Sequence, residues 1–331
     1  MVEIIFTLDY EIYGNGGGSL KELVYEPAQK LTAVFKKWNA RFVAFIEVAE
    51  LEIIETSGTD KAIDLVKNQV RDFQRDGYEL GLHLHPQWYN GQFRDGKWAL
   101  DYGEYNLGAL PRERIVQIID RSIAYLRKLS GADDFTPFSF RAGNWLFQPP
   151  RTLASVLAER GIKVDSSVFK GGLQHQHKLD YRRALKNGYF WMFSENVNVP
   201  NPNGLLIELP IYTRMQPIWK MVTSKRIGLQ QKATTKIRGG KRRPFRLADY
   251  VRFMYPIKLD YCRMSIRELV RIIDIEMHKD QQNPNSYRPI IAIGHTKDLI
   301  DINTVDTLLS VLEKRQIKIS GFHDVYVNCK C

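Results

Sequence analysis

Apolar strand-like runs alternate with amphipathic helical runs along almost the whole sequence. A repeated strand-then-helix order is typical of a parallel sheet covered by helices, and such a sheet can be open or closed into a barrel. The helical runs carry apolar residues at three- and four-residue spacing, as at Ile115, Ile118, Ile119 and Ile123. We predict strands at 2–8, 41–48, 78–85, 138–141, 162–165, 205–210, 290–295 and 317–322. We predict helices at 28–38, 61–76, 112–129, 151–160, 266–279 and 304–315.

One segment interrupts this alternation and holds the excess positive charge. The 331 residues suit one large α/β barrel, so we predict a single domain over 1–331 with a basic insertion at 214–261. Residues 209–248 contain eleven Lys and Arg and no Asp or Glu, which equals the net charge of +11. Clustered cations attract phosphates and anionic lipid headgroups, so 214–246 is a candidate for peripheral membrane contact. A solvated loop is the alternative, and no recognition motif supports nucleic-acid binding.

The composition is that of a globular protein in a reducing compartment. Hydrophobic residues make up 44% and charged residues 26%, and no run approaches the roughly 20 apolar residues that cross a bilayer. The start of the chain carries no export-signal pattern. Three cysteines are too few for a disulfide framework. We therefore expect a cytoplasmic protein, associated with the inner membrane surface if the basic insertion binds lipid.

Two strand ends carry pairs of polar residues at two-residue spacing. His83 and His85 end one expected strand, and Asp9 and Glu11 end another. Residues i and i+2 of a strand point to the same face, so each pair is directed at one place. Imidazoles and carboxylates are common metal ligands, and zinc in catalytic sites takes three protein ligands and keeps one position open. A hydrogen-bonded structural role for the histidines and a loop-capping role for the acids are the alternatives.

Further polar residues stand at other expected strand ends. Arg141, Asp165 and His295 each follow an apolar run. In parallel α/β folds the carboxyl ends of the strands form the active site, so these residues are expected to converge with the two pairs. The set predicts a metal-dependent hydrolase with a carboxylate base and a histidine acid. A structural ion pair for Arg141 and a core position for His295 remain open alternatives.

The order of these motifs resembles the polysaccharide deacetylases of carbohydrate esterase family four, the NodB homology domain. Thr7-Leu8-Asp9 matches the strand end that carries the catalytic base, and Glu11 can replace the usual ligand at the position of Tyr10. His83 matches the first histidine of a pair separated by three residues. Gln87 stands at the second position, so either His85 completes the site or Gln87 is a weak substitute.

The later motifs of that family follow in the same order. They are matched by Phe140-Arg141-Ala142-Gly143-Asn144-Trp145, by Asp165-Ser166-Ser167, by Glu208-Leu209-Pro210 and by His295 after its apolar strand. The resemblance covers nearly the whole chain and implies a distorted (β/α) barrel, similar to a TIM barrel. It assigns catalysis to Asp9, His295, Arg141 and Asp165, a divalent metal, expected to be zinc, to Glu11, His83 and His85, and substrate binding to Trp145, Trp88, Ser167 and Tyr10.

The activity implied by this resemblance is removal of an acetyl group, expected to be N-acetyl, from a sugar. Water held by the metal would be deprotonated by Asp9, and His295 would protonate the leaving amine. The expected substrate is an acetylated sugar or glycan precursor, which the basic insertion suggests to be phosphate-bearing or lipid-linked. Alternatives are a non-catalytic carbohydrate or anionic headgroup binder on the same scaffold, and another metal-dependent hydrolase such as a phosphoesterase.

Overall fold

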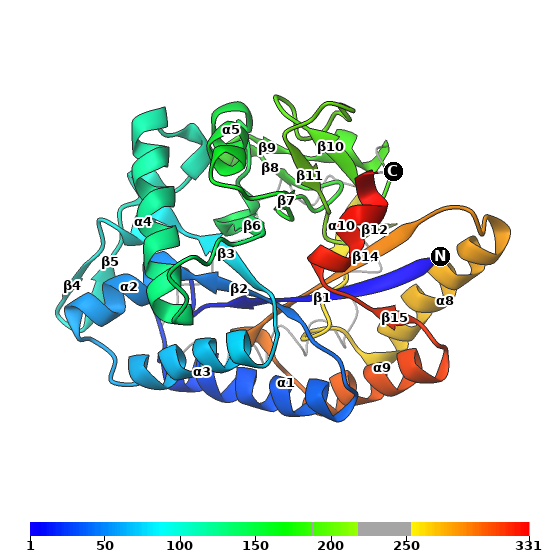
Figure 1. The fold of residues 1–331 in the computed structure, drawn as a ribbon, viewed down its shortest axis with the longest axis horizontal. Helices are drawn as coiled ribbons and strands as arrows, with labels where there is room; N and C mark the ends of the chain where they lie inside the picture. The colour runs from blue at the N-terminus through cyan, green and yellow to red at the C-terminus, as the bar shows by residue number, and fades with distance from the viewer. Residues whose placement is uncertain (187, 218–252, 331) are drawn as a thin grey trace.

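The computed structural model describes residues 1–186, 188–217 and 253–330. Within these ranges, nine strands form one sheet that curls into a distorted barrel (Figure 1). Neighbouring strands run in the order β10-β11-β7-β6-β3-β2-β1-β14, β15 pairs with β1, and only β10 and β11 are antiparallel. The strands are β1 (Val2–Tyr10), β2 (Val43–Glu47), β3 (Leu80–Leu84), β6 (Ser139–Ala142), β7 (Val164–Asp165), β10 (Trp191–Phe193), β11 (Leu206–Glu208), β14 (Arg288–His295) and β15 (Lys318–Ile319).

Isolated bridges, rather than a continuous ladder, join the two sides of the barrel. Ile211, three residues after β11, pairs with Ile291 of β14, and Asp260 pairs with Ile293 of the same strand. The sheet is therefore continuous from β14 through β1 to β11 and returns to β14 through single residues. The prediction of a distorted (β/α) barrel is confirmed.

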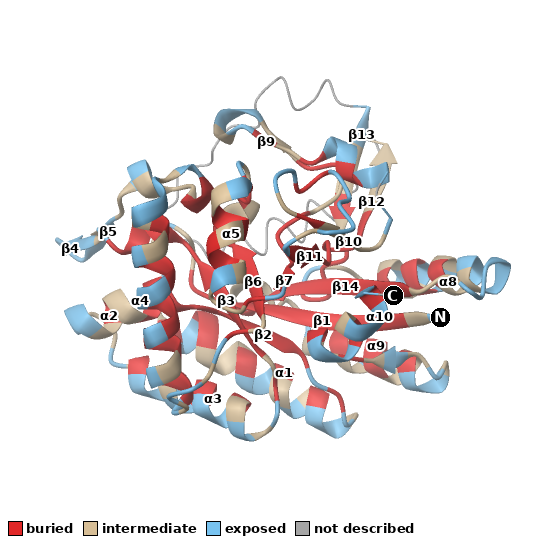
Figure 2. Cartoon of the chain, turned by 45° about the horizontal axis from the view of Figure 1, so that its top comes forward, coloured by how far each residue is buried: buried red, intermediate tan, exposed pale blue. Residues whose placement is uncertain are grey.

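The main helices cover the outside of this sheet. Figure 2 shows the buried residues concentrated on the strands and on the helix sides that face them. These helices are α1 (Glu26–Lys37), α2 (Val48–Ser57), α3 (Ile63–Arg75), α4 (Arg112–Ser130), α5 (Arg151–Glu159), α8 (Ile266–Gln282) and α9 (Ile302–Lys314), whereas α10 (Phe322–Lys330) packs on the inner side. Short helices are η1 (Lys21–Tyr25), η2 (Pro86–Trp88), η3 (Tyr102–Glu104), η4 (Leu107–Ala109), η5 (Gly143–Trp145), η6 (His175–His177), η7 (Arg182–Lys186) and η9 (Thr296–Asp298). All the predicted helices are present, within a few residues of the expected bounds.

Strand alternation separates the two sides of β1. Ile4, Phe6 and Leu8 belong to the larger core cluster, which includes the buried residues of the covering helices, whereas Ile5 belongs to a smaller cluster inside the barrel. Because side chains alternate, Asp9 shares the inward face of Ile5. The same rule puts Leu82 outward and His83 inward on β3. Gly81 has no side chain on this inward face, where a Cβ would lie 2.6 Å from the Phe45 ring.

Helix α10 closes one end of the barrel interior. Phe322 and Val325 pack in the inner cluster, and the Phe322 ring centroid lies 5.9 Å from that of Phe45. This helix was not expected, although Phe322, Val325 and Cys329 carry three- and four-residue spacing. The inner cluster therefore fills the closed end with apolar side chains, and the polar strand ends occupy the other end.

Helix α2 was also missed, because no turn residue separates it from β2. Glu47 ends the strand and caps the helix, with its carboxylate accepting a hydrogen bond from the backbone N–H of Glu50. Ser, Thr, Asp and Asn are the usual cap residues, so a glutamate gives little warning of a helix start. Gly58 ends α2 in the left-handed conformation, with φ of 63°.

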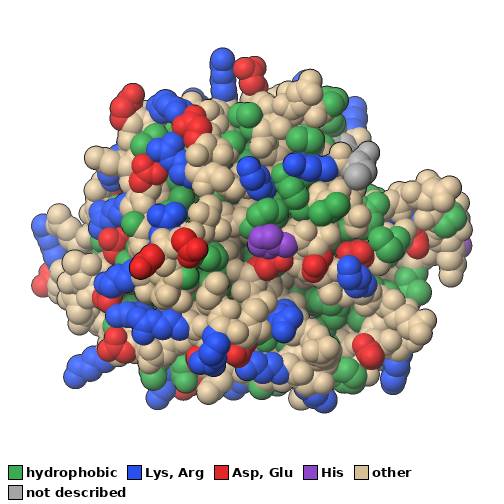
Figure 3. Space-filling model, viewed as in Figure 1, with side chains coloured by type: hydrophobic (Ala, Val, Ile, Leu, Met, Phe, Trp, Pro, Cys, Tyr) green, Lys and Arg blue, Asp and Glu red, His purple; other side chains and the backbone are tan. Residues whose placement is uncertain are grey.

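Small hairpins extend from the barrel. They are β4 (Gln92–Arg94) with β5 (Lys97–Ala99), β8 (Leu173–Gln174) with β9 (Leu179–Asp180), and β12 (Thr213–Pro217) with β13 (Met254–Lys258). The β12–β13 hairpin forms the base of the predicted insertion at 214–261, most of which lies outside the described residues. Of the eleven cations in residues 209–248, Arg214 alone belongs to the part that the structure describes. Figure 3 shows acidic and basic side chains interspersed over one face of the molecule.

A pair of buried carboxyl groups joins β7 to β11. Asp165 and Glu208 lie opposite each other in the parallel register, and both are fully buried. Burial raises the pKa of each carboxyl, and Asp165 raises that of Glu208 further. The neutral form of the Glu208 carboxyl is therefore favoured, and the Asp165 carboxyl accepts the Ser167 hydroxyl at 2.6 Å.

We expect Glu208→Gln to make the protein less sensitive to rising pH. A carboxyl whose pKa is raised on folding contributes fully to stability below its unfolded pKa, and the contribution is lost as pH rises toward the folded value. Glutamine keeps the acceptor for the Val168 N–H and cannot ionise. The free energy of unfolding of the variant relative to wild type should rise by about 1 kcal/mol or more from pH 4.5 to 7.5, measured by urea unfolding. The matched control is the exposed Glu22→Gln, for which this difference should not change with pH. If the difference for Glu208→Gln also stayed constant, the raised pKa of Glu208 would be contradicted.

Candidate metal centre

The inward-facing strand ends meet at the polar end of the barrel. Asp9 lies beside His295 in the β1–β14 register, and His83 lies between Glu47 and Arg141 in the registers of β2, β3 and β6. These residues are buried, each exposed by 8% or less. The sequence placed them at separate strand ends, and the barrel brings them together.

One carboxylate and two imidazoles form a compact set of metal-type ligands. Glu11 Oε2 lies 3.0 Å from His85 Nε2 and 3.6 Å from His83 Nε2. A tetrahedral ion bound at about 2.0–2.1 Å separates its ligand atoms by roughly 3.3 Å. The three ligand atoms lie within 4.8 Å of one another, so their spacing fits a divalent cation such as zinc.

His83 is held with one nitrogen directed into this cluster. Its Nδ1 lies 2.9 Å from the backbone oxygen of Arg141, and its Nε2 is buried without a hydrogen-bond partner among the described residues. Because a carbonyl oxygen only accepts, Nδ1 carries a proton, so in the neutral imidazole the Nε2 lone pair is available to a metal. Such a backbone contact is the usual way a protein fixes a metal-binding histidine. His83 therefore fits a ligand role directly.

His85 fits the same role when a neighbouring amide presents its oxygen. Gln87 Nε2 and Asn144 Nδ2 lie 3.3 Å and 3.2 Å from His85 Nδ1, while Gln87 Oε1 is buried without a partner. Half a turn of the Gln87 amide would let Oε1 accept the Nδ1 proton, which frees Nε2 for a metal. Gly143 makes room for the ring, since a Cβ there would lie 2.7 Å from His85 Cγ. In that orientation Gln87 would support His85 as a ligand.

Lys297 completes the surroundings of Glu11. Its Nζ donates to Glu11 Oε1 at 2.8 Å and to the Ile12 carbonyl at 2.9 Å. Burial would raise the pKa of Glu11, but Lys297 and His85 outweigh it and hold that pKa well below its ordinary value. Glu11 therefore favours its ionised form, the form that a metal ligand requires. No sequence motif pointed to Lys297, although it lies two residues after His295, which ends β14.

Two further buried acids, also missed from the sequence, hold the backbone beside the ligands. Glu47 Oε1 accepts the N–H of His85 at 2.7 Å, and Glu50 Oε1 accepts the N–H of Ile12 at 2.9 Å. Burial raises the pKa of both acids well above the ordinary value, and Glu50 adds to the effect on Glu47. Glu47 is the last residue of β2 and lies opposite His83 in the register, so its position at a strand end was the available signal.

Asp9 lies next to the metal-type cluster, between Arg141 and His295. Its Oδ1 accepts from Arg141 Nη1 at 2.5 Å, and its Oδ2 lies 3.4 Å from His295 Nε2. Burial acts to raise the pKa of Asp9, but Arg141, His83 and His295 together hold it below the ordinary value. Burial lowers the pKa of His295. An ionised acid therefore faces a histidine that releases a proton readily.

Arg141 is bonded on several sides and does not face solvent. Its Nη2 donates to the hydroxyls of Thr7 and Ser166 at 3.0 Å each, and its Nε donates to the Ser166 carbonyl at 2.9 Å. Its guanidinium carbon lies 4.1 Å from the Phe45 ring centroid. Arg141 thus orients Asp9 from inside the barrel wall.

Among the other residues predicted for catalysis or substrate binding, Trp145 lies at the site, whereas Trp88, Asp165 and Ser167 lie in the core. Trp145 is partly exposed, and its ring centroid lies 6.4 Å from that of His295. Trp88 and Ser167 are fully buried, and Ser167 links Asp165 to the N–H of Ala142. Asp165 and Ser167 therefore support the β6–β7 end without lining an open surface.

The expectation that Tyr10 contacts substrate is wrong. Tyr10 follows Asp9 on the strand and points to the opposite, helix-covered side. Its hydroxyl donates to Gln69 at 2.7 Å, its ring packs against Phe73 of α3, and the side chain is fully buried.

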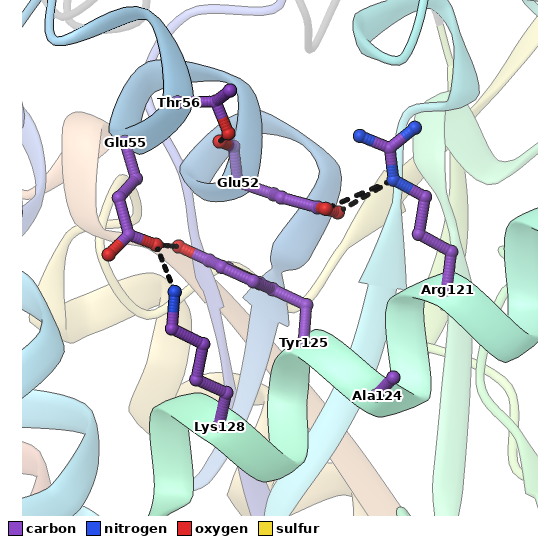
Figure 4. Close-up of a pocket in the computed structure, with 7 residues that line it drawn as sticks. All are labelled: Glu52, Glu55, Thr56, Arg121, Ala124, Tyr125 and Lys128. Carbon is purple, nitrogen blue, oxygen red and sulfur yellow. Dashed lines mark hydrogen bonds and ion pairs between the residues drawn. The ribbon is translucent and has the colours of Figure 1, made fainter.

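A separate surface cleft lies between α2 and α4, away from these residues. Its charged groups pair with one another: Arg121 with Glu52 at 3.0 Å, and Lys128 with Glu55 at 3.3 Å, where the Tyr125 hydroxyl also donates to Glu55 (Figure 4). These pairs leave little unmet bonding capacity for a ligand. Within the described ranges, no helix has the length and apolar content to cross a membrane.

The fold is that of a group of solved α/β barrels. A protein from Mycobacterium smegmatis assigned as a polysaccharide deacetylase has 13% identity and a TM-score of 0.54, covering 99% of this chain and 90% of its own. One from Pseudomonas aeruginosa PAO1, with the same assignment, has 12% identity and a TM-score of 0.53, covering 98% and 89%. A 4-alpha-glucanotransferase from Thermococcus litoralis has 14% identity and a TM-score of 0.52, covering 99% of this chain and 38% of its own.

At these identities the comparisons establish the fold alone. The resemblance to polysaccharide deacetylases is thereby confirmed at that level, and a glucanotransferase shares the fold. No protein-family model matches the sequence, and no curated protein matches it.

Replacing Gln87 by leucine should weaken metal binding, because leucine cannot accept the His85 Nδ1 proton. Outer hydrogen-bond partners of ligating histidines typically contribute 10- to 100-fold in affinity, so we expect a loss of about that size. Zinc titration against a competing chelator measures it directly.

The matched control is Gln176→Leu, because Gln176 is exposed and contacts His177, outside the cluster. It should leave zinc affinity unchanged, and Gln87→Glu, which restores an acceptor, should bind more tightly than Gln87→Leu. Equal affinity in wild type and Gln87→Leu would show that Gln87 does not set the His85 tautomer.

Proposed function

We propose that this protein is a metal-dependent hydrolase that removes an acetyl group, most simply N-acetyl, from a sugar. The observation that carries this proposal is the contact between two groups: the Glu11–His83–His85 cluster and the adjacent Asp9–His295 pair. A metal-ligand set beside an ionised acid and a histidine is the minimum needed for hydrolysis of an amide. Membership of the carbohydrate deacetylases is part of this proposal and agrees with the shared fold.

Each residue has a defined task in the reaction. A divalent ion held by Glu11, His83 and His85, for which zinc is the expected choice, supplies Lewis acidity at the acetyl carbonyl. Asp9 accepts a proton from the attacking water, so that a C–O bond forms as the acetyl C–N bond breaks. His295 delivers a proton to the leaving nitrogen, which yields acetate and a free amine. Arg141 keeps Asp9 ionised and in place.

Trp145 is the side chain best placed to contact the sugar. It is partly exposed and follows Arg141 by four residues on the same strand end. Its ring centroid lies 6.4 Å from the His295 ring, so a sugar against Trp145 would bring a substituent close to the proposed acid. We assign it the groove wall that the family resemblance implies.

A non-catalytic carbohydrate or anionic headgroup binder is the second candidate. The ion pair between Lys297 and Glu11 favours it, because a lysine already neutralises the carboxylate without any metal. Metal analysis of the purified protein separates the two, since the hydrolase requires one ion per chain and the binder requires none. Release of acetate against release of phosphate separates a deacetylase from a phosphoesterase.

Asp9→Asn should lower kcat for acetate release by about 10²- to 10⁴-fold, the usual contribution of a general base. Asparagine still offers an oxygen to Arg141, so the fold and the zinc affinity should be retained; both are checked by urea unfolding and chelator titration. Wild-type turnover in a folded, metal-loaded Asp9→Asn protein would remove Asp9 as the base.

The proposed substrate is an acetylated glycan precursor on the cytoplasmic side, phosphate-bearing or lipid-linked, with the basic residues 214–246 contacting the inner membrane surface. Clustered cations contribute about 1 kcal/mol per residue near an anionic membrane. The protein should therefore sediment with phosphatidylserine vesicles at 50 mM salt, less at 500 mM, and not with neutral vesicles. Absence of binding at low salt would remove the membrane part of the proposal and leave the hydrolase part standing.

A further inference from the structure

The hairpin at the base of the insertion places a lysine against the proposed sugar wall. Lys258 ends β13 opposite Thr213 of β12. The next residue, Leu259, donates its N–H to Tyr212 and accepts from Ile293 of β14, each at 2.8 Å. These bonds fix the end of the hairpin beside the strand that carries His295. Lys258 is therefore positioned by the barrel, not by a free loop.

The ammonium group of Lys258 lies on aromatic rings and not on a carboxylate. Its Nζ is 3.2 Å from the Trp145 ring centroid and 4.9 Å from that of Phe169. Trp145 and Phe169 pack edge to face, with ring centroids 5.4 Å apart. A cation over an aromatic face is stabilised by the ring quadrupole, but by less than an ion pair in a desolvated site.

The other cations near the reaction site are already matched by carboxylates. Arg141 pairs with Asp9, Lys297 pairs with Glu11, and Arg263 lies 3.6 Å from Asp298. Within the described ranges, no carboxylate oxygen lies within ion-pair distance of Lys258.

Asp260, two residues later, is only a partial counter-charge for Lys258. Burial raises the pKa of its carboxyl, which weakens its negative charge near neutral pH, and its Oδ1 accepts the Cys262 N–H. Burial lowers the pKa of Lys258 to about 7, and Asp260, followed by Asp9, acts in the opposite direction. The Lys258 amine is thus within electrostatic reach of the reaction centre and lacks a full counter-charge.

We propose that Lys258 and Trp145 form a subsite for an anionic substituent, a phosphate or a carboxylate, carried by the acetylated sugar. The proposal rests on the function proposed above and narrows its substrate class to acidic sugars. The anion would supply the charge that the described surroundings of Lys258 lack, and Trp145 would hold the adjoining ring beside His295. This subsite does not involve the cations of 214–246, because Lys258 and Trp145 both lie outside that range.

Three probes distinguish the sources of negative charge. N-acetylglucosamine is the neutral reference, N-acetylglucosamine 1-phosphate carries a phosphate, and the uronic acid of N-acetylglucosamine carries a carboxylate. Inorganic phosphate is a fourth ligand, which lacks a sugar. Equilibrium binding is measured by calorimetry on the full-length, zinc-loaded protein. We expect the charged sugars to bind more tightly than the neutral one, and free phosphate to bind more weakly than the sugar phosphate.

Lys258→Met should reduce the ratio of charged-sugar to neutral-sugar affinity by about 10- to 100-fold, the range of a charge-assisted hydrogen bond. Lys258→Arg should restore most of the ratio. Lys170→Met is the matched control, because Lys170 also lies over an aromatic ring, Tyr189, at 5.3 Å, but its Nζ donates to the Gly188 carbonyl. It should leave the ratio unchanged.

Equal weakening of charged and neutral sugars by Lys258→Met would overturn the proposal, because Lys258 would then act only by holding Trp145. So would a wild-type protein that does not prefer either charged sugar. The binding assay does not depend on turnover, so a preference that depends on Lys258 without any acetate release would defeat the hydrolase and retain the subsite. Acetate release from neutral and charged sugars at equal rates, without any preference for charged sugars in binding, would retain the hydrolase and defeat the subsite.

Discussion

The buried guanidinium of Arg141 is the interaction on which both halves of the site depend. Its side chain bonds Asp9 and Thr7 of β1 and Ser166 beyond β7, so it ties three parts of the barrel together. Its backbone oxygen accepts from His83 and sets the imidazole tautomer. One residue therefore orients the proposed base through its side chain and a proposed ligand through its main chain. A buried arginine is costly without such partners, which explains why the surrounding hydroxyls point inward.

Strand alternation explains why the fold and the inward set of polar residues were predictable, and why Tyr10 was misplaced. The apolar runs and the i, i+2 pairs fixed the faces of β1 and β3, so the convergence of Asp9, Glu11, His83 and His85 followed from geometry. Applied strictly, the same alternation excludes Tyr10, because it stands between Asp9 and Glu11 and must point outward.

Other parts of the site depend on packing that no local pattern reveals. Lys297 reaches Glu11 from a different strand end, and Glu50 reaches Ile12 from a helix that has no cap signal. Lys258 lies on Trp145 because the β12–β13 hairpin is bonded to β14, and its sequence neighbourhood gave no indication of a strand. Such contacts join residues from 38 to 286 positions apart, and short-range periodicity carries no information on them.

The charge balance of the site is consistent with both the metal and an acidic sugar. Asp9 and Glu11 are matched by Arg141 and Lys297, and the raised pKa of Glu47 and Glu50 keeps these acids towards their neutral form. Lys297 engages Oε1 of Glu11, which leaves Oε2 facing both imidazoles, so the ion pair orients the carboxylate without blocking it. A divalent ion would therefore make an almost neutral cavity positive. Such a cavity favours an ionised water, a developing oxyanion and an anionic substituent at Lys258, because each would lower the same excess of positive charge.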